Sequence, residues 1–217
     1  MIDIKNLSKS YGSRTLWSDV TFSISSGEML AVVGPSGSGK STLLNCLGLL
    51  DRPSAGAILH EGKDITRFGR REVRSFRRDV LGYLFQNYAL IENATVSANL
   101  KVAVKPHRSS QGKVGATIAE ALDRVGLGGR EKETIYHLSG GEQQRVALAR
   151  LMVKQPTLVL ADEPTGALDD ANATMVVDIL REMSEAGCAV VIATHNDYVR
   201  DRCDAVFTVK ESSLVGS

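Results

Sequence analysis

The amino-acid sequence predicts an α/β fold: a mixed core sheet, an N-terminal antiparallel segment and an inserted helical segment. Short apolar runs at residues 29–33, 158–161 and 189–193 are typical of parallel strands buried on both faces. Helix-compatible sequence follows each run, and strands that alternate with helices indicate an α/β core. Over residues 20–25 apolar side chains alternate with Ser and Thr, which is typical of antiparallel sheet.

Four segments carry helix-compatible sequence. They are residues 40–50, 116–125, 141–154 and 171–186, the last with an apolar stripe of residues three or four positions apart. Residues 87–154 break the rhythm of strand and helix, because they are helix-patterned and contain no convincing buried strand. We therefore expect a helical subdomain at 87–154, inserted into a core formed by residues 1–86 and 155–217.

Length and composition restrict the function classes. The 217 residues suffice for one sizeable domain, and 26 basic against 25 acidic side chains argue against a surface built to bind nucleic acid. Three widely spaced cysteines predict reduced thiols rather than a metal site or disulfide framework. No apolar run approaches the ~20 residues of a membrane-spanning helix, and the start has no apolar signal region, so we expect a cytoplasmic protein.

A glycine-rich motif lies between the first buried strand and the helix expected at residues 40–50. It fits GxxxxGK[ST], in which backbone N–H groups and a helix N-terminus surround nucleotide phosphates. We expect Lys40 to reach the β- and γ-phosphates and Ser41 to place its hydroxyl on Mg²⁺. The predicted phosphate-binding residues are Gly34, Pro35, Ser36, Gly37, Ser38, Gly39, Lys40, Ser41 and Thr42.

Two carboxylates follow the apolar run at residues 158–161. Asp162 and Glu163 stand at a strand tip, where the ligand crevice of an open α/β sheet lies. Asp162 is the expected Mg²⁺ partner through water, and Glu163 is placed to orient or deprotonate the attacking water. The alternative is that both acids only cap a following helix.

A second anion site is predicted at the start of the helix expected at residues 141–154. Ser139 and the glycines after it offer hydroxyl and N–H donors there, and a nucleotide held by Lys40 cannot also occupy this site within one chain. Two chains must therefore share each ATP. The motif at residues 138–145, Leu-Ser-Gly-Gly-Glu-Gln-Gln-Arg, resembles the LSGGQ signature of ATP-binding-cassette (ABC) ATPases.

The resemblance covers nearly the whole chain and implies the ABC-ATPase form of the P-loop NTPase fold. It also implies a head-to-tail homodimer around two ATP with Mg²⁺, in which signature residues of one subunit contact the nucleotide bound by the other. The implied contact residues are Ser139, Gly140, Gly141, Glu142 and Gln143. The loop that resembles the one crossing the dimer interface comprises Ala167, Leu168 and Asp169.

Three more residues match positions of that family. Tyr11 resembles the aromatic that stacks on adenine, with an ordinary strand tyrosine as the alternative. Gln86 resembles the glutamine that senses Mg²⁺ and the attacking water, and it would share the metal site with Ser41 and Asp162. His195 stands at a strand tip like the switch histidine that contacts γ-phosphate and steadies Glu163. The implied catalytic residues are Glu163, His195 and Gln86.

Other segments suggest a subgroup. Residues 51–56, 67–78 and 81–87 are similar to lipoprotein-release, macrolide-exporter and antimicrobial-peptide-exporter cassettes, and residues 85–91 to cassettes of bacteriocin export. The apolar residues 88–91 predict either a groove for a helix of a membrane subunit or core of the helical subdomain. The six arginines at 67–78 predict either a solvated helix face or a docking surface for an acidic partner or anionic lipid headgroups.

Together these motifs predict the ATP-binding and hydrolysing subunit of an ABC transporter. ATP would close the dimer, hydrolysis would reopen it, and the motion would drive a membrane permease at the cytoplasmic face. The expected task is export or extraction of a peptide, lipoprotein or drug. The alternatives are a soluble ABC ATPase acting on nucleic acid or ribosomes, a small-molecule kinase and a non-catalytic nucleotide-gated scaffold.

Overall fold

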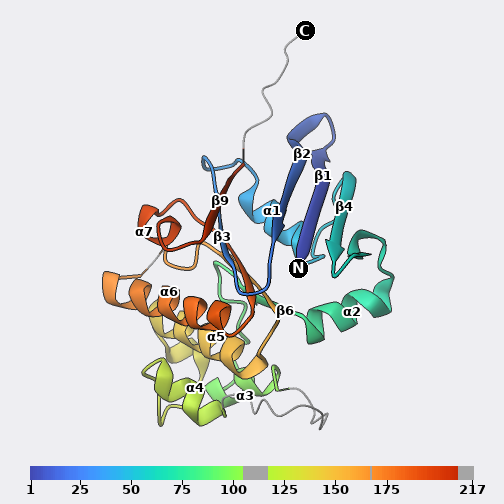
Figure 1. The fold of residues 1–217 in the computed structure, drawn as a ribbon. Coiled ribbons are helices and arrows are strands. Elements are labelled where there is room, and N and C mark those ends of the chain that lie inside the picture. The colour runs from blue at the N-terminus through green and yellow to red at the C-terminus, as the bar shows by residue number, and fades with distance from the viewer. Residues whose placement is uncertain (105–116, 167, 210–217) are drawn as a thin grey trace.

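Two separate sheets form the framework of the chain (Figure 1). The computed structural model describes residues 1–104, 117–166 and 168–209. The core sheet pairs its strands in parallel, in the order β6 (Leu81–Leu84), β7 (Leu158–Asp162), β8 (Ala189–Ala193), β3 (Met29–Val33) and β9 (Ala205–Thr208). The second sheet is antiparallel, in the order β2 (Arg14–Ile24), β1 (Ile2–Tyr11), β4 (Ala55–His60) and β5 (Lys63–Asp64). The core sheet, which we expected to be mixed, has parallel strand pairs. The antiparallel strands expected at the N-terminus form the second sheet.

Helices cover the core sheet, and they are the main regular structure in the described part of the segment between β6 and β7. The helices of the described residues are α1 (Lys40–Leu47), α2 (Arg70–Asp79), α3 (Val96–Lys101), α4 (Ile118–Arg124), α5 (Gly140–Lys154), α6 (Asp170–Glu185), α7 (Asp197–Arg200) and the 3-10 helices η1 (Ile65–Arg67) and η2 (Ile135–His137). The helix expected at residues 40–50 ends earlier, because Gly48 follows Leu47 and Leu49 has a left-handed φ of 57°.

Side-chain caps fix the starts of α4, α5 and α6. Thr117, Ser139 and Asp169 each accept a hydrogen bond from a backbone N–H in the first turn, and each helix begins at the next residue. These starts lie within two residues of the predicted ones. Residue 116, the predicted first residue of α4, lies outside the described residues.

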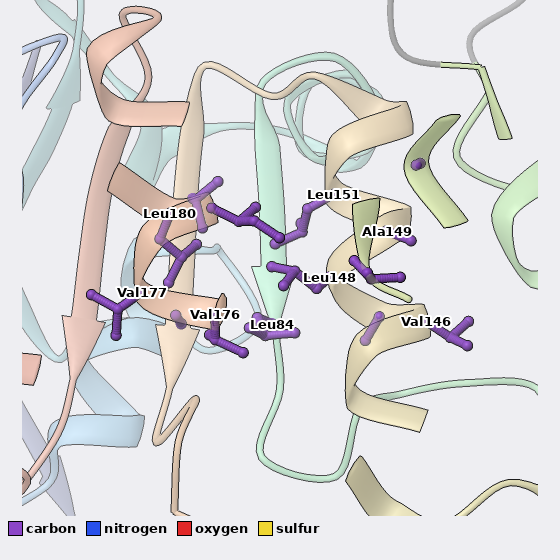
Figure 2. Packing of buried hydrophobic residues seen from close by; sticks show 14 of the residues in the cluster. Leu84, Val146, Leu148, Ala149, Leu151, Val176, Val177 and Leu180 are labelled. Atoms are coloured by element: carbon purple, nitrogen blue, oxygen red, sulfur yellow. The ribbon is translucent and has the colours of Figure 1, made fainter. Parts of the chain in front are cut away.

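Alternate residues of the central strands enter two different apolar clusters. In β7, Leu158 and Leu160 join a cluster with α1 and the antiparallel sheet, whereas Val159 and Ala161 join a cluster with α5 and α6. Figure 2 shows the second cluster, where side chains of α5 and α6 lie around Leu84 of β6. Both faces of the core sheet are therefore covered, which explains why its strands are unbroken apolar runs.

The described part of residues 87–154 contains the helices α3, α4, η2 and α5. It contains no strand, and its β-structure is limited to an isolated bridge between Thr95 and Thr134. In Figure 1 α3 and α4 lie at the end of the molecule away from the antiparallel sheet. Both helices pack on α5. None of the described helices is long and apolar enough to span a membrane. That this segment is a separate subdomain stays a prediction.

The arginine-rich segment forms η1 and α2, and most of its arginines are exposed. Arg67 pairs with Asp64 at 3.0 Å and Arg78 with Asp79 at 2.8 Å, while Arg77 donates to the carbonyls of Gly48 and Leu49. Only Phe76 of α2 is buried. These features are those of a solvated helix face, and a docking role stays a prediction.

Candidate nucleotide site

The phosphate loop, residues 34–39, joins the end of β3 to the start of α1. Gly34, Gly37 and Gly39 have φ values of 155°, 80° and 91°. A Cβ at Gly39 would lie 2.7 Å from Nε1 of Trp17, which donates to the Gly39 carbonyl at 3.3 Å. Position 39 therefore requires glycine for both conformation and space, and the loop is held in a tight curl.

Two polar side chains point into this loop. Nζ of Lys40, which is 8% exposed, donates to the carbonyls of Gly34 at 2.9 Å and Pro35 at 3.1 Å. The buried hydroxyl of Ser38 has no hydrogen-bond partner among the described residues. Phosphate oxygens are acceptors that suit a buried ammonium group and a buried hydroxyl, so the loop fits a nucleotide phosphate.

The other predicted residues of the phosphate site lie on the same loop and helix. Pro35, Ser36 and Gly37 are exposed at the loop rim, and Thr42 is half-buried on α1.

Ser41 and Asp162 meet at the tip of β7. Oγ of Ser41 donates to Oδ1 of Asp162 at 3.0 Å. Burial is the main cause that raises the pKa of the Asp162 carboxyl, and the hydrogen bond from Ser41 opposes it. Hydroxyl and carboxylate oxygens are ligands that suit Mg²⁺, and a cation would offset the cost of burying this carboxylate. The described residues contain no cluster of three or more His, Cys, Asp or Glu side chains for a metal, so phosphate oxygens and water would complete the coordination.

Glu163 and His195 lie side by side because β7 and β8 are neighbouring parallel strands, with Asp162 in register with Ala193. Oε1 of Glu163 is 2.9 Å from Nδ1 of His195. Glu163 is 15% exposed at its side chain and His195 is 72% exposed, so the pair reaches from the sheet edge toward solvent. The backbone of Glu163 has a left-handed φ of 46° and its N–H donates to the Ala193 carbonyl at 2.9 Å. A non-glycine residue held in this conformation at a strand tip is a feature of functional sites.

Gln86 lies two residues beyond the end of β6, at the same edge of the core sheet as Asp162. Its side chain is exposed and makes no hydrogen bond with the described residues. The loop after it is fixed from α5, where Arg150 donates to the carbonyls of Ala89 at 2.7 Å and Tyr88 at 2.9 Å. The structure therefore places Gln86 near the carboxylates without a contact to them.

The apolar residues 88–91 divide between core and surface. Tyr88 and Leu90 pack partly against the cluster around α5, whereas Ala89 is exposed and Ile91 is 54% exposed. Tyr88 and Ala89 both have left-handed φ values, 63° and 45°. Tyr88 and Leu90 thus agree in part with the interpretation as core, and a groove for a helix of a membrane subunit stays a prediction.

Tyr11 lies on β1 with its ring 53% exposed. Its hydroxyl donates to Oδ2 of Asp51 at 2.6 Å, and Nζ of Lys9 lies 2.8 Å from Oδ1 of Asp51 and 4.5 Å from the ring centroid. The hydrogen bonds from Lys9 and Tyr11 lower the pKa of the Asp51 carboxyl. The hydroxyl end of the ring is thus held by Asp51, and Nζ of Lys9 lies over the ring.

The signature motif forms the N-terminus of α5. Ser139 is the N-cap, Ser139 and Gly140 are exposed, and Gly141 is half-buried beside Leu168. The carboxylate of Glu142 turns back toward Ser139, and the side-chain amide of Gln143 donates to the Leu138 carbonyl at 3.0 Å. The motif thus lies at the start of α5, whereas the phosphate loop leads into α1, and within the described residues no hydrogen bond or ion pair joins the two.

The segment expected to cross a dimer interface follows the carboxylates. Ala167 lies outside the described residues, and Leu168 is half-buried against the cluster around α5. Asp169 accepts a hydrogen bond from the Asn172 N–H at 2.8 Å as the N-cap of α6. Asn172 in turn accepts from Arg145 of α5 at 2.7 Å, so this loop is tied to the signature helix.

Comparison with known families decides between the classes of P-loop protein. The family model described as ABC transporter matches residues 17–166, which is more than half of the chain. The chain belongs to the ABC transporter family. The matched span includes the phosphate loop, both carboxylates and the signature motif.

Relatives of this ABC cassette act in different settings. The cell division ATP-binding protein FtsE of Escherichia coli (strain K12) is 40% identical over 100% of this chain and 98% of its own length. The pyoverdine export ATP-binding/permease protein PvdT of Pseudomonas savastanoi pv. phaseolicola is 37% identical over 99% of this chain and 34% of its own. The macrolide export ATP-binding/permease protein MacB 1/2 of Paracoccus denitrificans is 37% identical over 99% and 33%. The chain thus spans about a third of the length of these export proteins, and the comparable identities do not separate an exporter subgroup.

Solved structures support the same family. The dimeric post-hydrolysis structure of the ATP-binding cassette MJ0796 bound to ADP and Pi aligns with a TM-score of 0.86 and 31% identity, over 97% of this chain and 94% of that one. The dimeric structure of MJ0796 as a bacterial ABC transporter cassette aligns with a TM-score of 0.85 and 32% identity, over 97% and 94%. The predicted cassette fold is confirmed, and the chain is an ABC ATPase cassette.

Sequence reasoning missed several residues that organise the site of this ABC cassette. Lys9 and Asp51 position Tyr11, Arg150 fixes the loop after Gln86, and Arg130 binds Glu142. Lys9 and Asp51 are 42 positions apart, and the acceptors of Arg150 are backbone carbonyls, which no side-chain motif reports. For Arg130, the signal that the sequence offers is an arginine within three positions of acidic residues.

Proposed function

We propose that this cassette is the ATP-binding and hydrolysing subunit of a transporter. We also propose that two copies form a head-to-tail dimer with two Mg²⁺-bound ATP molecules at its interface. The contact between Glu163 and His195, next to the Ser41–Asp162 pair, is the observation that carries the proposal. It supports hydrolysis because it holds a carboxylate at the strand tip where, in this proposal, a γ-phosphate bound by Lys40 would lie. The separate position of Ser139 supports sharing of each nucleotide between two chains.

Binding would exchange contacts inside the phosphate loop. Nζ of Lys40 leaves the carbonyls of Gly34 and Pro35 for phosphate oxygens, and the Ser38 hydroxyl gains an acceptor. Ser41 and Asp162 would hold Mg²⁺, which neutralises part of the phosphate charge when bound. Tyr11 would offer its exposed ring to the adenine.

Hydrolysis would use Glu163 as the proton acceptor. One carboxylate oxygen, Oε1, is engaged by His195, which leaves Oε2 to accept a proton from water. The water oxygen forms a bond to the γ-phosphorus as the bond to the bridging oxygen of ADP breaks. In this proposal His195, which is exposed at the strand tip, holds the carboxylate in place and contacts the phosphate when ATP is bound.

The partner we propose is a membrane permease, with the cassette at its cytoplasmic face. The relatives PvdT and MacB 1/2 are export ATP-binding/permease proteins, which supports this partner. Arg150 ties the loop after Gln86 to the signature helix, so a change at the nucleotide would move both together. The proposed task is export or extraction of a peptide, lipoprotein or drug. The most specific version of this proposal is bacteriocin export.

A hydrolysis-blocked variant tests the proposed dimer. Glu163→Gln should form a dimer on size-exclusion chromatography only when ATP and Mg²⁺ are present, and Lys40→Ala in the same background should abolish that dimer. A Glu163→Gln chain that stays monomeric, or that still turns ATP over at the normal rate, would remove the proposal. ATP turnover that requires a small acceptor molecule would instead support a kinase.

A further inference from the structure

Glu142 occupies both donors of the signature serine. Oε2 of Glu142 accepts hydrogen bonds from the Ser139 N–H and from the Ser139 hydroxyl, each at 2.8 Å. The N–H of Glu142 donates back to Oγ of Ser139 at 3.4 Å. The hydroxyl proton expected to meet a phosphate of the partner subunit is thus directed at a carboxylate of its own chain.

Arg130 holds the other oxygen of the same carboxylate. Its Nη1 donates to Oε1 of Glu142, while its Nε and Nη2 donate to Glu133 at 2.9 Å and 2.6 Å. The hydrogen bond from Arg130, followed by those from Ser139, lowers the pKa of the Glu142 carboxyl to about 2. Glu142 is therefore ionised at neutral pH, and one guanidinium is shared by two carboxylates.

We propose that Glu142 is a positioning residue that restrains the Ser139 hydroxyl before ATP arrives, and that Arg130 offsets its charge so that a triphosphate can approach. This inference rests on the proposed function. During closure Ser139 must exchange one anionic acceptor for another, from the Glu142 carboxylate to a phosphate oxygen of the partner's nucleotide. The negative charge of Glu142 opposes that approach and Arg130 weakens the opposition, so the pair sets the ATP concentration at which two chains join.

A glutamine at position 142 isolates the charge from the helix cap. Its side-chain carbonyl oxygen can still accept from the Ser139 N–H, because Glu and Gln both complete a capping box at this position. The substitution removes the negative charge, and the neutral acceptor holds the hydroxyl less strongly. A change in dimerisation would therefore report on charge and on the serine proton rather than on loss of α5.

The experiment uses the full chain in the Glu163→Gln background and measures the dimer fraction against ATP concentration, with Mg²⁺, by analytical ultracentrifugation. Adding Glu142→Gln should lower the half-maximal ATP concentration roughly three- to tenfold, the range for one charge near a phosphate at a screened surface. Adding Arg130→Gln should raise it by a similar factor, and Arg130→Lys should largely restore it. With Glu142→Gln present, Arg130→Gln should have little further effect.

Two controls separate this role from simple support of the helix. Glu133→Gln also removes a carboxylate from Arg130 but has no hydrogen bond to Ser139, and it should shift the ATP midpoint by less than Glu142→Gln. The midpoint of Glu142→Gln should also depend less on salt concentration, which a purely structural contact would not predict.

The outcomes distinguish this inference from the proposed function. An ATP-dependent dimer with the same midpoint and salt dependence in Glu142→Gln would overturn the role of Glu142 and leave the shared site intact. Additive effects of the changes at positions 130 and 142 would overturn the coupling. Absence of any ATP-dependent dimer in the Glu163→Gln parent would overturn the proposed function itself, and this inference with it.

Discussion

The phosphate loop and the signature end of α5 both offer donors to a phosphate, yet they hold them in different ways. In the phosphate loop Lys40 and Ser38 are buried and Gly39 is fixed against Trp17. At the signature end Ser139 is exposed, and its donors are engaged by the charged Glu142. The donors of the phosphate loop are in place before the nucleotide binds, whereas the Ser139 hydroxyl must exchange one acceptor for another when the two chains associate. We therefore expect binding to depend on the first and association on the second.

The largest effect on ATP hydrolysis is expected from a change at the tip of β7, next to the Ser41–Asp162 pair. Glu163→Gln removes the proton acceptor and should lower the hydrolysis rate by roughly 10² to 10⁴, the usual contribution of a general base. ATP binding should persist, because Lys40 and the phosphate loop are untouched. Single-turnover hydrolysis and equilibrium ATP binding measure the two quantities, with Glu185→Gln, an exposed acid at the end of α6, as a matched control. Hydrolysis that survives at the control rate would move the base elsewhere.

Removal of the buried cation should affect binding next. Lys40→Ala should weaken ATP binding roughly 10- to 100-fold, because charge-assisted hydrogen bonds to phosphate are lost. Titration calorimetry measures the affinity, and Lys63→Ala, an exposed lysine on the antiparallel sheet, serves as the control. Equal affinities for the two variants would contradict the assignment of the phosphate loop.

The link between the signature helix and the loop after Gln86 should respond to a change at Arg150. Arg150→Ala leaves the carbonyls of Tyr88 and Ala89 without their donors, and we expect a loss of roughly 1–3 kcal/mol in the free energy of unfolding. The rate of ATP hydrolysis should fall as well, since the loop after Gln86 is released from α5. Urea unfolding with Arg71→Ala, an exposed arginine of α2, as the control tests the first expectation. Unchanged stability and hydrolysis rate in Arg150→Ala would show that this side chain does not join the loop after Gln86 to the signature helix.

The smallest effect concerns acid stability of the signature end. The pKa of Glu142 is lowered from its ordinary value near 4.5 to about 2 in the folded chain. A depressed carboxyl pKa contributes stability that is present above the ordinary value and is lost as pH falls toward 2. Glu142→Gln lacks this contribution, so its stability should fall less between pH 5 and pH 2 than that of the unmodified chain. Denaturant midpoints across that range measure the difference, and parallel curves would indicate that the pairs with Arg130 and Ser139 do not form in solution.

The two regions also differ in how far the sequence predicts them. The strand before the phosphate loop is an unbroken apolar run, and its glycine pattern is local, so Lys40 and Ser41 can be assigned from neighbouring residues alone. The contact of Glu163 with His195 follows from two strand tips at one sheet edge. The assignment of Lys40 and Ser41 depends on periodicity and short spacing, whereas the contact of Glu163 with His195 is implied by the resemblance to the ABC family.

The signature end depends on contacts that short spacing does not state. Arg130 reaches Glu142 from a loop before η2, and nothing in the residues between them predicts that its side chain turns inward. The spacing Ser139-x-x-Glu142 is that of a capping box and could predict the hydrogen bonds between these two residues, but it does not predict the ion pair with Arg130. Tyr11 is similar, because its position depends on Asp51 from a loop 40 residues away. Side-chain orientation in loops is decided by tertiary packing, and the sequence pattern alone leaves it open.

The most direct test of shared nucleotide sites mixes two inactive variants. Lys40→Ala destroys the phosphate loop and Ser139→Ala removes the signature hydroxyl, so each variant alone should hydrolyse ATP slowly. In a mixed head-to-tail dimer one site combines the intact loop of one chain with the intact signature of the other. We predict that the mixture hydrolyses ATP well above the mean of the two separate rates, and a rate equal to that mean would contradict the shared site.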